Sequence, residues 1–151
     1  MLVEGKLRKM IYIASDHAGF KLKEKLKKKI AMEDLSLDYV KEDDYPDYAK
    51  RLCKMVLKTK GSGILICGTG IGMSIAANKF KGIRAGVCWN KTSARFAKSH
   101  NAINVLCIPA RLINEKEAMI VVNTWLKTKV SDAKRHKRRI NKIKGVGGCG
   151  K

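Results

Sequence analysis

Short apolar runs alternate along the chain with segments that carry apolar residues at helical spacing. The runs are rich in β-branched and small apolar residues and are too short for buried helices, which favours strands. The predicted strands cover residues 10–14, 37–40, 63–67, 83–89 and 104–108. The predicted helices cover residues 18–31, 46–58, 73–80, 91–98, 114–128 and 131–143.

Because predicted strands and helices alternate with short connections, the pattern is typical of a parallel sheet covered by helices on both faces. The sequence therefore predicts a single α/β domain, with three α/β/α layers, a five-stranded parallel sheet and a C-terminal helix. We assign this domain to residues 10–143. Residues 1–9 are then an N-terminal extension, and residues 144–151 are a flexible glycine-rich tail.

Candidate chemistry lies where the predicted strands end, because open α/β sheets bind ligands beyond the carboxyl ends of their strands. The residues found there are Asp16 with His17, then Cys67, Asn90 and Arg111. These polar and nucleophilic side chains follow different strands. A parallel sheet would therefore bring them to one edge.

A glycine-rich loop follows the third predicted strand and is the most informative segment. Gly68, Gly70 and Gly72 allow unusual backbone angles and a close approach to a ligand. The loop leads into a helix, whose first N–H groups and dipole favour an anion. Cys67 precedes these groups directly, so they would stabilise its thiolate and make it a general base near neutral pH.

Two nucleotide-binding motifs do not match this loop. The GTGIG stretch at 68–72 is not GxGxxG; it follows the third strand rather than the first, and the next strand supplies no acidic residue. The sequence GxxxxGK[ST] is also absent from the chain. We therefore predict no nucleotide cofactor.

The charge changes the picture, because 33 Lys and Arg against 13 Asp and Glu give a formal net charge of +20. Such a charge suggests an anionic partner, either a phosphorylated metabolite or nucleic acid. Aromatic residues are only 6% of the chain, and no aromatic nucleic-acid-binding motif is present, which makes nucleic acid the weaker alternative. For most of the lysines, a solvated helix surface is the simpler interpretation.

The five cysteines are widely spaced without a CxxC pair, so the sequence predicts no metal site of the zinc or iron–sulfur type. We interpret Cys53, Cys88 and Cys107 as reduced, buried core residues, and Cys149 as exposed in the tail. No apolar run is long enough for a membrane span, and residues 1–9 lack the apolar stretch of a secretory signal. The expected location is cytoplasmic.

Several segments occur in an order that resembles one known family. They are SDHAGFKLK, DYPDYA, ILICGTGIGMSIAANKFKGIRAGVC, SHNAIN and KRHKRRI, and together they extend over about residues 10–143. The chain resembles ribose-5-phosphate isomerase type B, in the family that also contains the galactose-6-phosphate isomerase subunits. The resemblance implies a Rossmann-like α/β/α domain that forms a homodimer, or a tetramer. It also implies an active site between two subunits and no metal or nucleotide cofactor.

The resemblance also implies roles for individual residues. The family's catalytic cysteine falls on Cys67, and its ring-opening histidine falls on His100. Some members use a glutamate six residues after the cysteine, but Met73 occupies that position here. Thr69 and the loop amides would hold the negative charge of an enediolate. Sugar-contacting positions fall on Asp16, Tyr45, Gly68, Gly70, Ile71, Gly72 and Asn101, and phosphate-binding positions on His17, Arg111, Arg135 and Arg139.

The implied reaction interconverts ribose 5-phosphate and ribulose 5-phosphate, as in the non-oxidative pentose phosphate pathway. A six-carbon phosphate, such as allose or galactose 6-phosphate, is the alternative substrate within the family. The chain departs from the family pattern before the DYP motif, where LDYVKEDDYPDYA replaces a longer glycine-containing stretch. This departure leaves the position of Tyr45 open.

Overall fold

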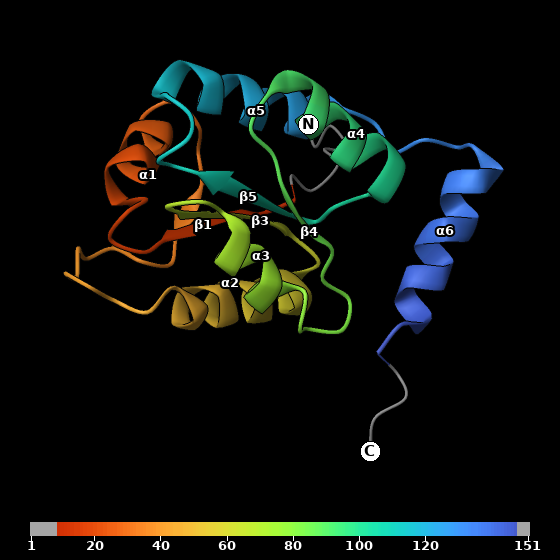
Figure 1. Ribbon diagram of the computed structural model, residues 1–151, viewed down its shortest axis with the longest axis horizontal. Coiled ribbons are helices and arrows are strands. Elements are labelled where there is room, and N and C mark those ends of the chain that lie inside the picture. The colour runs from red at the N-terminus through yellow and green to blue at the C-terminus, as the bar shows by residue number, and fades with distance from the viewer. Residues whose placement is uncertain (1–8, 148–151) are drawn as a thin grey trace, which may run out of the picture.

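The computed structural model describes residues 9–147, which form the predicted three-layer α/β/α domain (Figure 1). All five strands are parallel, and they lie in the order β2-β1-β3-β5-β4. Their bounds are β1 Ile11–Ser15, β2 Glu33–Asp34, β3 Ser62–Cys67, β4 Ala85–Val87 and β5 Val105–Pro109. The parallel sheet and the fold class are therefore confirmed.

Helices cover both faces of the sheet. On one face lie α1 (Phe20–Lys27), α4 (Lys91–Asn101) and α5 (Glu115–Lys127); on the other lie α2 (Tyr45–Thr59) and α3 (Ile71–Ala77). The last helix, α6 (Lys134–Gly145), extends beside the domain and contacts it mainly through α4 (Figure 1).

Alternating side chains of the strands supply the two cores. In β3, Ile64 and Ile66 face the α1, α4 and α5 side, while Leu65 and Cys67 face the α2 and α3 side. All four are buried, and burying one large aliphatic side chain stabilises the fold by about 1.5–3 kcal/mol. The last residue of the central strand therefore lies in the core wall, at the carboxyl edge of the sheet.

The prediction of a strand over residues 37–40 is wrong. The second strand is instead the polar pair Glu33–Asp34, which aligns with Tyr12 and Ile13 of β1. Residues 37–40 have no strand partner, and Leu37 is 70% exposed. The apolar pattern of this segment misled the prediction, because β2 is held by charges rather than by buried side chains.

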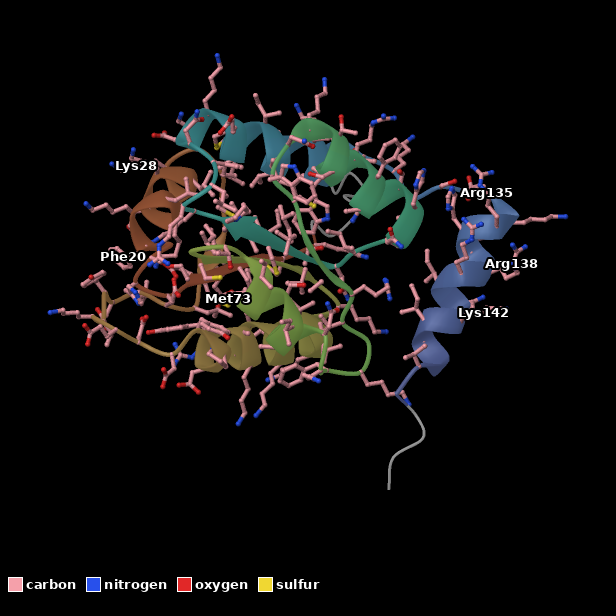
Figure 2. All side chains as sticks on the ribbon, in the orientation of Figure 1. Phe20, Lys28, Met73, Arg135, Arg138 and Lys142 are labelled. Carbon is pink, nitrogen blue, oxygen red and sulfur yellow. The ribbon has the colours of Figure 1, made fainter. Side chains whose placement is uncertain are left out.

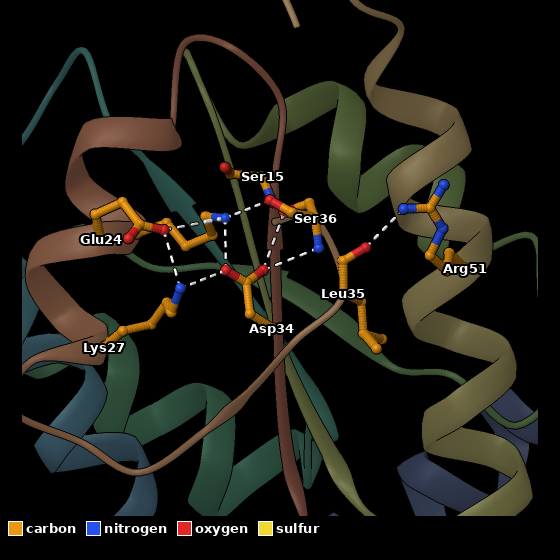
Figure 3. Close-up of polar contacts among 8 residues, drawn as sticks. Ser15, Glu24, Lys27, Asp34, Leu35, Ser36 and Arg51 are labelled. Carbon is orange, nitrogen blue, oxygen red and sulfur yellow. Dashed lines mark hydrogen bonds and ion pairs between the residues drawn. The ribbon is translucent and has the colours of Figure 1, made fainter. Parts of the chain in front are cut away.

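A buried ion-pair network makes this polar strand stable (Figure 3). The Lys23 side chain is fully buried, and its Nζ donates to Asp34 Oδ2 at 2.7 Å and to the Ser36 carbonyl. The Nζ of Lys27 lies 2.6 Å from the same carboxylate oxygen. Burial raises the pKa of Asp34, but the hydrogen bonds from the two lysines outweigh it and leave the pKa below its ordinary value. The network thus anchors α1 to the sheet edge.

The remaining boundaries agree with the predictions to within four residues, and one of the differences affects a candidate site residue. The fourth helix continues to Asn101 rather than ending near 98, so its last turn includes His100. Asn90 accepts a hydrogen bond from the Ser93 amide in a capping box, so it has a helix-capping role. No helix among residues 9–147 has the length and apolar content to cross a membrane.

Candidate active site

Cys67 lies at the carboxyl end of β3 with its thiol turned into the glycine loop. The residue is 4% exposed, and the backbone N–H of Gly70 donates to its Sγ at 3.2 Å. Gly70 has a φ of +73°, a conformation that a side chain would strain. The loop can therefore present an N–H group to the sulfur only because glycine occupies this position.

Two polar side chains lie directly on the loop backbone, in the space that a Cβ would occupy if the glycines were replaced. A Cβ on Gly72 would lie 2.4 Å from the Tyr45 ring, and a Cβ on Gly68 would lie 2.7 Å from Nη1 of Arg111. The amide of Arg111 also donates to the Gly68 carbonyl at 2.9 Å. The altered segment before the DYP motif therefore still places Tyr45 against the loop.

Asp16 and His17 lie at the same edge, directly after β1. The carboxylate of Asp16 accepts a hydrogen bond from the Gly19 amide at 3.1 Å, and burial raises its pKa above the ordinary value. The imidazole of His17 pairs with Asp43, whose Oδ1 lies 2.8 Å from Nδ1 and 2.9 Å from the His17 backbone nitrogen. The other ring nitrogen of His17 is thus available to a ligand.

Asp43 is a member of this site that the sequence analysis missed. Burial raises its pKa, but hydrogen bonds from the His17 amide, the His17 ring and Tyr48 outweigh it and leave the pKa below its ordinary value. Burial and the hydrogen bond to Asp43 raise the pKa of Tyr48 to about 12, so its phenol stays protonated. The doubled acid at residues 43–44 was the available signal, although one sequence does not say which acid turns inward.

Among the described residues, these acidic and imidazole groups are the ones whose spacing could hold a metal ion. Potential ligand atoms of Asp16, His17 and Asp43 all lie within 4.8 Å of one another. The His17–Asp43 pair and the Asp16–Gly19 hydrogen bond already use atoms of this group. We interpret the group as a hydrogen-bonding cluster, and the absence of a metal stays a prediction.

A second group of predicted site residues lies at the junction of α4 and α6. His100 stacks on His136, with ring centroids 4.0 Å apart, and on Phe96 at 4.7 Å. Burial lowers the pKa of His136, as do the positive charges of His100 and of the predicted phosphate ligands Arg135 and Arg139. In residues 9–147, neither arginine has an ion-pair partner, so an anion would find uncompensated charge here.

The two groups lie at opposite edges of the sheet. Cys67 and the glycine loop follow a strand, so they are at the carboxyl edge. The helix α4 leads back from the end of β4 to the start of β5, so His100 and Asn101 in its last turn are at the amino edge. Figure 1 shows the strand arrowheads on the side away from α6, and Figure 2 shows Arg135 on that distant helix. A single chain therefore does not bring the two groups together.

The other predicted residues behave as follows. Thr69 is exposed, and its Oγ1 accepts a hydrogen bond from the Ile71 amide at 3.3 Å. Cys53, Cys88 and Cys107 are buried and free, as predicted, and burial raises the pKa of Cys53 to about 12 and that of Cys88 to about 11. These thiols stay protonated near neutral pH and do not compete with Cys67 as bases. Cys149 lies outside the described residues.

Comparisons with known proteins point to one family. Residues 11–143 match the family model described as "Ribose/Galactose Isomerase". A probable ribose-5-phosphate isomerase B of Mycoplasma genitalium is 43% identical over 141 residues, with 88% of this chain and 92% of that protein covered. The ribose-5-phosphate isomerase B of Escherichia coli is 37% identical over 144 residues, with 91% and 96% covered.

Solved structures agree with these relatives. A ribose 5-phosphate isomerase from Thermotoga maritima superposes with a TM-score of 0.85 at 48% identity, covering 91% of this chain and 99% of that one. A Mycoplasma genitalium structure with bound ribulose-5-phosphate has a TM-score of 0.82 at 40% identity, covering 89% and 93%. Because the family model matches well over half of the sequence and close relatives cover almost all of it, the chain belongs to the ribose/galactose isomerase family.

Proposed function

We propose that the protein interconverts ribose 5-phosphate and ribulose 5-phosphate, with Cys67 as the base that moves the proton. One observation carries the proposal: the Cys67 thiol meets a backbone N–H in a glycine loop that is flanked by a phenol and a guanidinium. A relative that is 40% identical has been solved with ribulose-5-phosphate bound, which supports the choice of substrate.

The chemistry follows from the groups around the loop. The Cys67 thiolate removes the proton from C2 of the open-chain aldose, and the electron pair moves to the carbonyl oxygen to give an enediolate. The thiol then returns the proton to C1, while the C2 hydroxyl proton moves to the C1 oxygen and leaves a ketone at C2. The Gly70 N–H donates to the Cys67 sulfur at 3.2 Å, which holds the sulfur against the glycine loop.

The carboxyl edge supplies the remaining contacts to the reacting atoms. The loop backbone, with the Thr69 hydroxyl, holds the negative charge that develops on the enediolate, and a donor of this kind is typically worth about 3–4 kcal/mol of barrier. Asp16, Tyr45 and Ile71 contact the sugar from this edge, whereas Asn101, at the amino edge, contacts it from a partner chain. His17 and Arg111, also at this edge, bind the phosphate, because their N–H groups can donate hydrogen bonds to its oxygens.

The site is completed by a second copy of the chain, which makes the functional unit a homodimer. His100 opens the sugar ring, and Arg135 and Arg139 bind the phosphate; they are four residues apart, which places them on one side of α6. These groups are at the amino edge of their own sheet and reach a glycine loop only in a partner. In symmetric dimers each copy contributes both halves, so two complete sites form.

Exposed apolar side chains beside the loop support this pairing. Ile71 and Ile75 on α3 are 56% and 59% exposed, although they are large aliphatic residues next to the catalytic loop. Trp89, just before α4, and Phe96, on α4, are also exposed. Apolar surface of this kind, next to polar site residues, is typical of a face that another chain covers.

The proposal is tested by an isomerase assay with ribose 5-phosphate, run with a chelator present and no nucleotide added. Allose 6-phosphate and galactose 6-phosphate run in parallel. We expect the highest kcat/KM with ribose 5-phosphate, and faster turnover of a hexose phosphate would move the specificity to the six-carbon alternative. If no sugar phosphate were converted, the proposal would be wrong.

Asp43→Asn should weaken binding of the phosphorylated substrate rather than slow the proton transfer. The substitution keeps the shape but removes the charge that pairs with the His17 ring. Hydrogen bonds to charged groups are worth about 1.5–3 kcal/mol, so we expect KM to rise by about tenfold or more with kcat changed little.

The matched control for this measurement is Asp38→Asn, which makes the same charge change in the same connecting segment. Asp38 is exposed and forms no ion pair among residues 9–147. Its KM should match that of the unsubstituted protein. An unchanged KM in Asp43→Asn would show that Asp43 does not position His17 for the substrate.

A further inference from the structure

A cavity at the amino edge of the sheet is lined by positive side chains from four separate segments. Its volume is about 350 Å³, within the range of small-molecule sites. Lys9 precedes β1, Lys60 ends α2, Arg84 precedes β4 and Lys98 belongs to α4. The cavity lies at the opposite edge from Cys67 and shares no residue with the proposed catalytic groups.

We propose that this cavity is a binding site for a phosphate-bearing anion of small-metabolite size. Among residues 9–147, four positive side chains line it, and no Asp or Glu does. None of the four forms an ion pair within the described part of the chain. Clefts lined by charge of one sign concentrate counter-ions, and this cleft would concentrate anions.

In another surface cavity of this protein, the charges of the clustered lysines are balanced by a carboxylate. That cavity, of about 570 Å³ between α1 and α5, is lined by Lys25 and Lys29. Both lysines pair with Glu115, at 3.1 and 3.3 Å, so their charges are already satisfied. Within the described part of the chain, the amino-edge cavity has no such carboxylate, and its cations come from segments far apart in the sequence.

The groups inside the cavity are arranged to meet oxygen atoms. Arg84 donates from Nε and Nη2 to the carbonyls of Asn101 and Ala102, which fixes its guanidinium and leaves Nη1 without a hydrogen bond in residues 9–147. A fixed guanidinium and flexible lysine amines are the usual donors for phosphate. Ser62 adds a hydroxyl to the same wall.

The electrostatics agree with an anion in this position. Burial lowers the pKa of Lys98, and the positive charges of Lys9 and Arg84 lower it further. Its amine lies 5.3 Å from the centre of the Trp125 ring, and no carboxylate of residues 9–147 lies within ion-pair distance of it. A bound anion would relieve this repulsion. It would also contact the arginine that holds the last turn of α4, one residue from His100.

The test is calorimetric titration of the full chain with inorganic pyrophosphate. The chain carries Arg135→Gln and Arg139→Gln, so that the proposed catalytic phosphate site is weakened. We expect saturable binding that remains in this background. Adding Lys98→Gln, or separately Lys60→Gln, should weaken it by about tenfold each, because each removes one charged contact. Lys25→Gln in the other cavity makes the same charge change and should leave the affinity unaltered.

Lys60→Gln is included because Lys60 is exposed and its replacement leaves the core intact, whereas Lys98 is half-buried. Ribose 5-phosphate is titrated in parallel, and binding that is tighter than that of pyrophosphate and is weakened by Lys60→Gln would assign the cavity to an organic phosphate. Absence of saturable binding, or equal affinity in the Lys60→Gln, Lys98→Gln and Lys25→Gln proteins, would overturn the proposal. The outcome does not depend on turnover, so it is separate from the test of the proposed function.

Discussion

Cys67→Ala should lower kcat for ribose 5-phosphate by about a thousandfold and leave KM nearly unchanged. A positioned general base contributes about 10²–10⁴-fold to a proton transfer, and alanine leaves the loop without any group that takes the proton. Substrate contacts come from other residues, so binding should persist. Steady-state kinetics over a range of substrate concentrations separates the two parameters.

Cys53→Ala is the matched control for this prediction. Both cysteines belong to the same buried cluster, on the α2 and α3 side of the sheet, so both variants remove a sulfur from the same core. Cys53→Ala should lower the melting temperature without a large change in kcat. Comparable kcat values for Cys67→Ala and the unsubstituted protein would show that Cys67 is not the base.

The second large effect is recovery of activity on mixing two inactive variants, Cys67→Ala and His100→Asn. In a shared site, a mixed dimer has one site with both substitutions and one site with neither. If subunits associate at random, half of the dimers are mixed, so about a quarter of all sites are complete. Co-refolding the two variants in equal amounts should therefore restore about a quarter of the unsubstituted activity.

A different pair of variants supplies the control. Cys67 and Arg111 both belong to the carboxyl-edge group, so Cys67→Ala mixed with Arg111→Ala leaves every site with one defect. This mixture should stay inactive. If neither mixture recovered activity, both halves of each site would have to come from the same chain, and the proposed dimer would be wrong.

The central part of the fold was predictable because its strands are apolar on both faces. Runs such as residues 63–67 pack against helices on each side, and such burial gives a signal that is visible in one sequence. The edge strand β2 was not predictable in this way. Its residues are acidic, and the partner that stabilises them, Lys23, appears in the sequence as one of many surface lysines.

In the candidate site, only the contacts between residues close together in the sequence were predictable. The glycine loop places Cys67 next to N–H groups a few residues away, so local sequence was sufficient. The pairing of His17 with Asp43 joins residues 26 positions apart through a segment without a recognisable pattern. The separation of Cys67 from His100 follows from the direction of α4 relative to the sheet. The alternation of strands and helices indicates this direction, but the sequence analysis did not use it to separate the two residues.

The sheet has short strands at both of its edges: β2 has two residues and β4 has three. An edge strand exposes unpaired backbone groups, on which a strand from another molecule can add and start a fibril. In this protein the exposed strand edge is short on each side of the sheet, and a net charge of +20 makes neighbouring molecules repel one another. The protein is thereby protected from edge-to-edge aggregation at high concentration, while its helical faces stay available for specific association.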